Sequence, residues 1–296
     1  MTLAQPIFKK VAVFGVGLIG GSFALALKAA GGAKDIVGVG RNPANLQRAL
    51  DLGVITQLEI DPARAVAEAD LVLLAMPVGQ MKGVMQAIAP HLAPATIVTD
   101  AGSTKQDVVR LALQYLPNHL PSFVPAHPIA GAENSGVDAA RADLFRGRNL
   151  ILTPLAETSN AAIERVKTAW QLCGMTVRQL SAAAHDQVFA AVSHLPHVLA
   201  FALVEALAAR SNAEDFFRYA GSGFRDFTRI ASSSPEMWRD ICLANRDALI
   251  QELENYQEEL QQLRRMILDS DGDGLEKLFE RARTARNEWL AQDEKK

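Results

Sequence analysis

Apolar and polar positions follow two different patterns along the chain. As far as about Gln179, short apolar runs rich in β-branched residues alternate with segments of helical periodicity; the runs lie in KVAVFG, DIVGVG, DLVLLAMP, TIVTDA, SFVPAH, LILTP and MTVRQL. Such alternation is typical of a doubly wound parallel sheet. Beyond Gln179 only helical periodicity remains. We therefore predict an α/β, Rossmann-type domain over residues 1–181 and an all-helical domain over residues 182–296.

The helical part contains a long apolar stripe. Its residues recur at steps of four and three, as on a packed helical seam; they are Leu249, Leu253, Tyr256, Leu260, Leu263 and Ile267. The stripe needs a partner surface, which is either the rest of the helical domain or a second copy of the chain. We expect the second copy, so that the helical domain makes a homodimer.

Composition excludes several classes of protein. The 296 residues carry a net charge of −3, and there is no long basic run, so we expect no nucleic-acid partner. The N-terminus lacks the features of a signal peptide, and no apolar run reaches membrane-spanning length. Cys173 and Cys242 lie far apart without a C-x-x-C spacing, which indicates neither a disulfide framework nor a zinc site. We expect a cytoplasmic protein without a membrane partner.

A glycine-rich turn follows the first predicted strand. The stretch VAVFGVGLIGG places Gly15, Gly17 and Gly20 in a G-x-G-x-x-G pattern, with Leu18 and Ile19 at the start of the next helix. One glycine makes the tight turn, one lets a pyrophosphate approach the backbone, and one lets helix and strand pack closely. The helix N-terminus attracts the phosphates. This arrangement predicts a dinucleotide site.

The position that selects between NAD and NADP holds no carboxylate. An acidic residue that binds the adenine ribose of NAD is expected at the end of the second strand, where the chain has Gly40, Arg41 and Asn42. An arginine there can pair with a 2′-phosphate, which favours NADP over NAD; the alternative is that Arg41 only stacks on the adenine. Pro77 ends another strand at the carboxyl edge of the sheet, where ligands bind.

Two further stretches reach the same edge. VTDAGSTK brings Ser103, which either caps the next helix or faces the cofactor. SFVPAHPIAG brings His127, which we expect just beyond a strand end, held by Pro128 and Gly131 in a loop. A neutral imidazole there can accept a hydroxyl proton while hydride leaves the same carbon.

Five long stretches carry a resemblance to a known family. GVGLIGGS, DAGSTK, HPIAGAENSG, AVSHLPHVLAFALV and GFRDFTRIASSSPEMWRDI resemble the prephenate dehydrogenases, a family that includes the arogenate and cyclohexadienyl dehydrogenases of tyrosine biosynthesis. The resemblance implies oxidative decarboxylation of prephenate or arogenate, with hydride transfer to NAD(P). It leaves open which of the two substrates is used, and inhibition by tyrosine is a hypothesis from product similarity.

The resemblance also implies roles for individual residues. His127 accepts the proton of the substrate hydroxyl, and Ser103 bonds to that histidine and to the same hydroxyl. The remaining members contact or enclose the substrate: His197 contacts it, Glu133 gates the pocket, and Arg229 grips a carboxylate with Asp226 as its partner. No role follows for His91, His119 or His185.

Three other interpretations compete. A nucleotide-binding sensor would need neither His127 nor Arg229, and β-hydroxyacid dehydrogenases generally use a lysine where this chain has SHLPHV. The stretch DSDGDGLEKLFE, residues 269–280, matches the ligand positions of an EF-hand calcium loop. Because it occurs once and carries the charged Glu276 where paired loops have an apolar residue, we expect an acidic turn instead of a calcium site.

Overall fold

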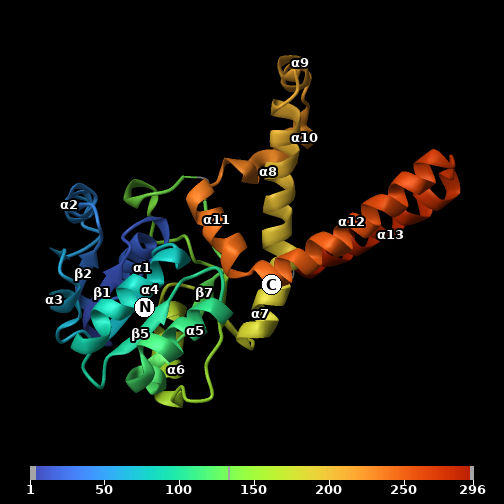
Figure 1. Cartoon of the computed structure of the whole chain (residues 1–296). Helices are drawn as coiled ribbons and strands as arrows, with labels where there is room; N and C mark the ends of the chain where they lie inside the picture. Colours follow the sequence, from blue (N-terminus) through green and yellow to red (C-terminus); the bar gives the residue numbers. More distant parts are fainter. Residues whose placement is uncertain (1–4, 133, 294–296) are drawn as a thin grey trace. The chain divides into compact units, whose positions relative to one another are not determined.

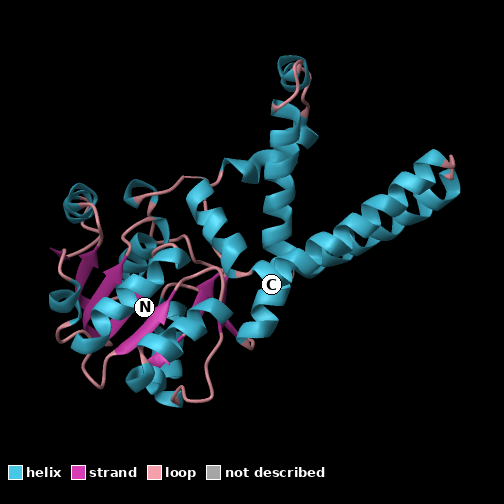
Figure 2. Cartoon of the chain, viewed as in Figure 1, coloured by secondary structure: helices cyan, strands magenta, loops and turns pink. Residues whose placement is uncertain are grey.

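A parallel sheet organises the first part of the chain. The computed structural model describes residues 5–132 and 134–293. Six strands lie in the order β3-β2-β1-β4-β5-β6, and every neighbouring pair is parallel. Their bounds are β1 Phe8–Phe14, β2 Ala33–Val39, β3 Gln57–Glu59, β4 Leu71–Leu74, β5 Ile97–Asp100 and β6 Phe123–Val124. This order is that of a Rossmann dinucleotide-binding sheet, as predicted. Figure 2 shows the strands in magenta among helices in cyan.

Helices cover both faces of this sheet, because alternate side chains of the buried strands point to opposite sides. In β1, Val11 and Val13 belong to one apolar core, and Ala12 and Phe14 to the other. The helices α1 Leu18–Ala29 and α6 Asn160–Leu172 pack on the first core, whereas the second contains residues of α3 Pro62–Val66, α4 Val78–Ile88 and α5 Gln106–Tyr115.

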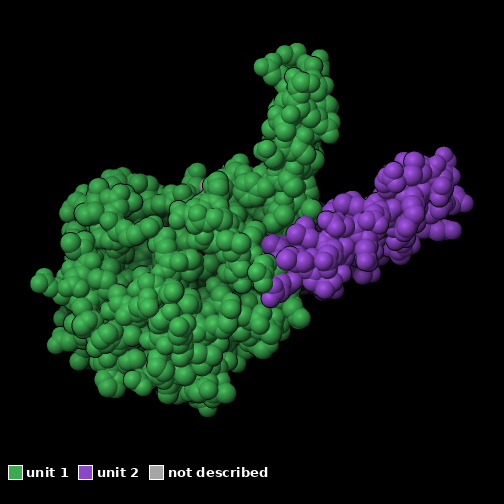
Figure 3. Space-filling model, viewed as in Figure 1, with its two compact units in different colours: residues 1–246 green, residues 247–296 purple. Residues whose placement is uncertain are grey.

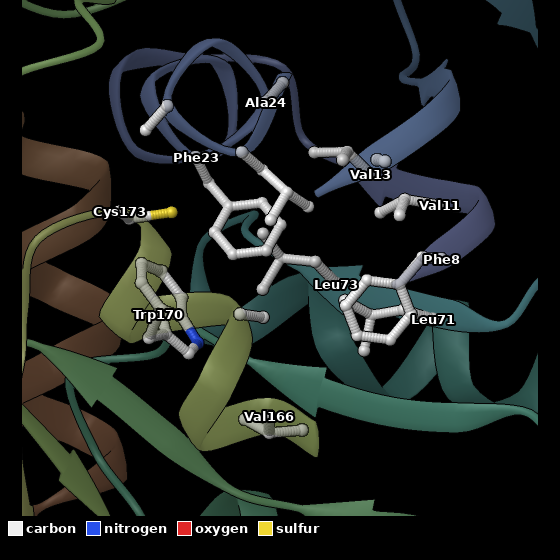
Figure 4. Close-up of a cluster of buried hydrophobic side chains, with 14 of the residues drawn as sticks. Phe8, Val11, Val13, Phe23, Ala24, Leu71, Leu73, Val166, Trp170 and Cys173 are labelled. Atoms are coloured by element: carbon white, nitrogen blue, oxygen red, sulfur yellow. The ribbon is translucent and has the colours of Figure 1, made fainter. Parts of the chain in front are cut away.

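The first core is built around an aromatic cluster. Phe23 of α1 lies 4.6 Å from Trp170 of α6, measured between ring centroids, and the same indole meets Phe145 edge to face at 5.2 Å. Figure 4 shows Phe23, Trp170 and Leu73 of β4 in one buried cluster. This packing fixes α1, whose N-terminus begins at the glycine-rich turn, against the sheet.

The last two predicted strands and the second half of the strand before them form a separate sheet. The strands β7 Ala126–Pro128, β8 Asn149–Leu152 and β9 Thr176–Gln179 make a three-stranded sheet in which β7 runs antiparallel to β8. The prediction of one parallel sheet was therefore wrong for this part. Pro125 divides SFVPAH into β6 and β7, since proline has no N–H to continue the ladder. The short edge strand β3 was also not predicted.

Only helices follow β9 in the described residues. The segments α7 Ala182–Phe189, η4 Ala190–His194 and α8 Leu195–Ala208 form one continuous run. By length and composition this run could cross a membrane, which the sequence analysis did not anticipate. The remaining helices are α2 Pro43–Asp51, η1 Ala89–His91, η2 Pro117–Ser122, η3 Val137–Ala139, α9 Ala213–Arg218, α10 Ser222–Thr228, η5 Arg229–Ser232, α11 Pro235–Ala244, α12 Arg246–Leu268 and α13 Gly272–Asp293 (Figure 1).

The chain divides into two compact units, residues 1–246 and 247–296 (Figure 3). The boundary predicted from the pattern lies at Ser181, whose side chain caps α7 by accepting a hydrogen bond from the N–H of Ala184. The boundary between the compact units lies further along the chain, after Arg246, because α7 packs on α5 and α11 packs on α4. Helices on both sides of the site therefore belong to the same compact unit.

Candidate active site

The three glycines of the turn meet different geometric requirements. Gly15 has a φ of +90°, and a Cβ there would lie 2.8 Å from the backbone of Ala75. At Gly20 a Cβ would lie 2.2 Å from the carbonyl oxygen of Gly15, so this glycine permits the close packing of α1 on the turn. A Cβ at Gly17 would meet no atom within 4 Å, so this glycine leaves open space at the N-terminus of α1.

A cavity of about 550 Å³ opens in front of this turn. Gly15, Gly17, Arg41 and Pro77 all line it. No side chain caps α1, so its first N–H groups remain available to an anion. The open space at Gly17 and the uncapped helix fit the pyrophosphate of a nicotinamide dinucleotide, which when bound supplies the acceptor for a hydride.

At the edge of this cavity next to β2, the strand is followed by Gly40, Arg41 and Asn42. The Asn42 side chain is used locally, because its Oδ1 accepts the N–H of Ala44 at 2.9 Å and caps α2. Arg48 also lines the cavity and forms an ion pair of 2.7 Å with Asp138. The exposed Arg41 lies on the same wall.

A second cavity adjoins the first, and a third adjoins the second at His127. One, of about 480 Å³, is lined by Gly17, Leu18, Ile19, Pro77, Ser103 and His127 among others. The other, of about 500 Å³, is lined by Ser103, His127, His197 and Arg229 among others. The residues predicted for the cofactor and those predicted for the substrate thus border connected spaces, with Ser103 and His127 on both.

His127 is held more firmly than the sequence predicted. It lies in the middle of β7, paired with Ile151 of β8, and not in a loop beyond a strand. Its Nδ1 lies 2.8 Å from Nε2 of His185, and its ring packs on Phe189 at 5.0 Å between centroids. Nδ1 of His185 lies 2.8 Å from a carboxylate oxygen of Asp186. Sequence analysis assigned His185 no role, and here it contacts the candidate base.

A buried ion pair ties this region to the parallel sheet. Lys105 forms it with Asp100, the last residue of β5, and its ammonium also donates to the carbonyl oxygen of Ala126 at 2.9 Å. The second oxygen of Asp100 accepts the N–H of Ala126 at 3.0 Å. Both groups of the residue before His127 are therefore bound to this ion pair, which fixes the backbone at the base.

Burial keeps the histidines of the site neutral. It holds the pKa of His127 well below the usual 6.5, and nearby His185, Lys105 and His194 lower it further. Burial likewise lowers the pKa of His185, although the hydrogen bond to Asp186 opposes this, and lowers that of His194 to about 4. Burial alone would raise the pKa of Asp186; hydrogen bonds from His185 and from the backbone of Gln106 and Lys105 keep it below the usual value.

The substrate side of the cavity is aromatic and cationic. His197 stacks on Trp238 with 3.7 Å between ring centroids, and its Nδ1 lies 2.8 Å from the carbonyl oxygen of Ser193. Its other nitrogen is thereby left as an acceptor. Arg229 begins η5, and Arg148, which the sequence analysis did not single out, lines the same cavity. Two arginines on one cavity suit a ligand with carboxylates.

Two predicted contacts are missing among the described residues, and a third predicted residue lies outside them. Ser103 borders the same spaces as His127, but among the described residues no hydrogen bond joins the two side chains. Asp226 is exposed in α10 and makes no ion pair with Arg229 within the described ranges; the helix ends at Thr228, and Arg229 belongs to the next turn. Glu133 lies outside the described residues.

His194 is buried at the wall of the substrate-side cavity, and the acidic turn links two helices. The fully buried His194 contacts Asn245, whose side-chain nitrogen lies 3.1 Å from its Nδ1. The turn after Leu268 joins α12 to α13, and Asp271 accepts the N–H of Gly274 at 2.9 Å. Within residues 5–132 and 134–293, no group of three or more acidic, histidine or cysteine side chains is arranged to hold a metal ion.

Comparisons with known proteins agree along nearly the whole chain. The family model described as prephenate dehydrogenase, nucleotide-binding domain, matches residues 23–179, and that of the prephenate dehydrogenase dimerization domain matches residues 181–281. The cyclohexadienyl dehydrogenase of Zymomonas mobilis is 39% identical over 95% of this chain and 96% of its own. The prephenate dehydrogenase of Bacillus subtilis is 38% identical over 92% of this chain and 74% of its own.

A solved structure of a family member has a similar fold. The prephenate dehydrogenase of Aquifex aeolicus, crystallised with hydroxyphenyl propionate and NAD⁺, superposes with a TM-score of 0.88 at 36% identity. The match covers 97% of this chain and 99% of that one.

Proposed function

The chain belongs to the prephenate dehydrogenase family, the oxidoreductases of tyrosine biosynthesis, and we propose that it oxidises and decarboxylates prephenate with His127 as the base. Family membership decides against a β-hydroxyacid dehydrogenase and against a sensor without activity. The observation that carries the residue assignment is the position of His127 and Ser103 on both of two adjoining cavities, one bordered by the glycine turn and one by Arg229.

Prephenate is a cyclohexadienol with a carboxylate opposite its hydroxyl. His127 takes the hydroxyl proton on Nε2 while the carbinol C–H leaves as hydride to the dinucleotide. The bond to the ring carboxylate then breaks and releases CO₂, and its electron pair makes the ring aromatic and leaves a phenolate oxygen. That oxygen takes the proton back from His127, so the histidine ends the cycle neutral and no proton is released.

The other residues orient the substrate. We assign Arg229 to a substrate carboxylate, His197 to a second polar contact, and Ser103 to the hydroxyl beside His127; these three line the substrate-side cavity. Arg148 is available for a second carboxylate. Since aromatisation drives the reaction forward, the protein supplies mainly orientation, a base and a carboxylate clamp. Glu133 as a gating residue stays a prediction from the resemblance.

An assay with four combinations tests this proposal. Purified protein is given prephenate or arogenate with NAD⁺ or NADP⁺, and reduced nicotinamide is followed by absorbance. We expect turnover with prephenate and a preference that identifies the cofactor. Activity with arogenate alone would be consistent with His127 as the base but would overturn prephenate as the substrate. Absence of turnover in all four, from folded protein that binds dinucleotide, would overturn the function.

For the cofactor we propose NADP. The end of β2 offers Arg41 and no acidic side chain at Gly40, while Arg48 is engaged by Asp138. An arginine–phosphate pair contributes roughly 1.5–3 kcal/mol, so Arg41→Ala should lower kcat/KM for NADP⁺ about 10- to 100-fold with little effect on NAD⁺. Arg110→Ala, at an exposed arginine of α5 that borders none of these cavities, is the control. Equal losses with both cofactors would mean that Arg41 stacks on the adenine.

We further propose a homodimer through the helical region. Exposed aromatic residues on or directly after α9 and on α10 support this, as does the apolar stripe of α12. The exposed residues include Phe217, Tyr219, Phe227, Leu260 and Ile267. The matched family domain is described as a dimerization domain. Light scattering should give twice the chain mass of 32.0 kDa. A monomer at micromolar concentration with full activity would overturn the proposal.

We propose that a second copy, and not lipid, covers the apolar helical run 182–208, and that the protein is cytoplasmic. This run carries buried polar side chains at His185, Asp186 and His194, which are costly in hydrocarbon. Cys173 and Cys242 are free thiols, as is usual in a reducing compartment. Cell fractionation tests both statements, and recovery in the membrane pellet would contradict them.

A further inference from the structure

We propose that His185 and Asp186 set the tautomer of His127, so that its Nε2 presents a lone pair to the substrate. Their side chains contact the base in series, with 2.8 Å from His127 Nδ1 to His185 Nε2 and 2.8 Å from His185 Nδ1 to Asp186 Oδ1. The inference rests on the proposed function only in taking His127 as the base. The hydrogen-bond order itself can be tested without turnover.

The direction of each hydrogen bond follows from Asp186. Its Oδ1 accepts the backbone N–H of Lys105 at 2.8 Å, and its Oδ2 accepts that of Gln106 at 2.9 Å. Two N–H donors directed at the two oxygens stabilise the ionised carboxylate, and the pKa of Asp186 accordingly lies below its usual value. An ionised carboxylate can only accept hydrogen bonds. Nδ1 of His185 must therefore carry the proton that it shares with Asp186.

The protonation of His185 fixes the direction of its hydrogen bond with His127. A neutral His185 with its proton on Nδ1 has only a lone pair on Nε2, the atom that faces His127. His127 must then donate from Nδ1, and its Nε2 is left without a proton. In an isolated imidazole side chain the opposite tautomer, with the proton on Nε2, is favoured. Without His185 the candidate base would thus more often present an N–H, which cannot accept a proton.

Burial makes this hydrogen-bond chain effective. The side chains of His185 and Asp186 are fully buried, so water does not compete for their hydrogen bonds. Phe189 packs on both imidazole rings, at 5.0 Å from His127 and 4.5 Å from His185, and limits their rotation. The backbone carbonyl of Asp186 accepts the side-chain N–H of Asn245 at 2.8 Å, which holds the residue from α11.

The carboxylate of Asp186 lies behind the base, with the imidazole of His185 between them, and the ammonium of Lys105 is paired with Asp100. Burial and the neighbouring His185, Lys105 and His194 keep the pKa of His127 well below its usual value, so the base returns the substrate proton readily. His185 and Asp186 are therefore positioning residues, which act through His127 and do not touch the substrate.

The first test reads the tautomer directly. In full-length protein with ¹⁵N-labelled histidine and no ligand, long-range ¹H–¹⁵N spectra near pH 7.5 separate protonated from unprotonated ring nitrogens. His127→Asn assigns the signals of the base. We expect a protonated Nδ1 and an unprotonated Nε2 at His127. A protonated Nε2 in the unmodified protein would overturn the inference, whatever the substrate proves to be.

The second test removes the acceptor. His185→Phe preserves a ring against Phe189, and we expect kcat to fall about 10²- to 10⁴-fold, the contribution of a correctly protonated base, with dinucleotide Kd unchanged. The same change at the exposed His91 of η1, which borders none of the three cavities, is the control. His185→Gln can offer an amide oxygen to His127, and should recover part of the rate and of the tautomer signal.

The two tests separate the possible failures. An unchanged tautomer and rate in His185→Phe, or a fall in rate with the tautomer intact, would overturn the inference. If His185→Phe does not fold, His185→Gln and the spectrum of the unmodified protein still decide. If the unmodified protein lacks turnover but shows the expected tautomer, the proposed function fails and the hydrogen-bond order stands.

Discussion

Gly20 offers a test of how the dinucleotide turn is built. In Gly20→Ala the new Cβ would lie 2.2 Å from the carbonyl oxygen of Gly15, 3.0 Å from Val13 Cγ1 and 3.1 Å from the Cβ of Ala75. An ordinary contact between carbon and a carbonyl oxygen is about 3.3–3.6 Å, so the backbone must separate by about 1 Å. Neither a backbone oxygen nor a Cβ can rotate away.

The expected cost can be worked from these contacts. Overpacking a core site costs about 1–3 kcal/mol, and a clash against backbone belongs at the upper end. Alanine recovers about 1 kcal/mol over glycine inside a helix. The net loss is therefore about 2 kcal/mol, which for a unit of this size lowers Tm by roughly 4–8 °C.

Gly17→Ala is the matched control, with the same substitution three residues earlier. No atom lies within 4 Å of its Cβ, and its φ of −105° is open to any residue, so we expect Tm to stay equal or rise slightly. The methyl group would occupy the space left for pyrophosphate, so dinucleotide Kd should rise. Thermal unfolding and dinucleotide titration of both variants check this. An unchanged Tm in Gly20→Ala would refute these assignments. So would a fall in Tm in Gly17→Ala as large as that in Gly20→Ala.

Four further outcomes follow from the site. His127→Asn should keep dinucleotide Kd and lose kcat about 10²- to 10⁴-fold, and unchanged turnover would remove it as the base. Arg229→Ala should raise KM for the substrate about 10- to 100-fold, more than it lowers kcat; an unaffected KM would move the clamp elsewhere. Since the pKa of His127 lies well below 6.5, kcat/KM should fall through protonation of the base only below that pH; a fall that begins at or above pH 6.5 would contradict the assignment. Folding lowers the pKa of His127, His185 and His194, so near pH 6.5 and below the unfolded chain binds more protons than the folded one. Tm should therefore fall from pH 6.5 toward 5, and a constant Tm would contradict the burial of these rings.

Local patterns predicted the elements that depend on local chemistry. The buried strands of the parallel sheet read as apolar runs because both faces are covered, and the glycine turn could be recognised because each glycine answers a backbone requirement. The grouping of His127, Ser103, His197 and Arg229 around one cavity was expected from the family resemblance. Periodicity alone would not have grouped residues so far apart in the chain.

Features that depend on tertiary context were missed. The edge strand β3 has only three residues, too few for a pattern. Pro125 was visible, but a proline at a strand end and a proline between two sheets look the same in a sequence. Arg148 sits before β8 with no signal that its side chain borders a cavity. His185 and Asp186 are an adjacent polar pair early in a helix, a pattern more typical of a solvated surface.

The position of the base depends on these missed contacts. The parallel sheet ends at Asp100 in β5, and that carboxylate, with Lys105, binds both backbone groups of Ala126. The Pro125 break frees β7 from the parallel ladder, and pairing with β8 then places His127 beside α7. The backbone N–H groups of Lys105 and Gln106 fix Asp186 in turn. Residues 100–106 therefore hold the base from both sides, through the backbone before it and through the carboxylate behind it.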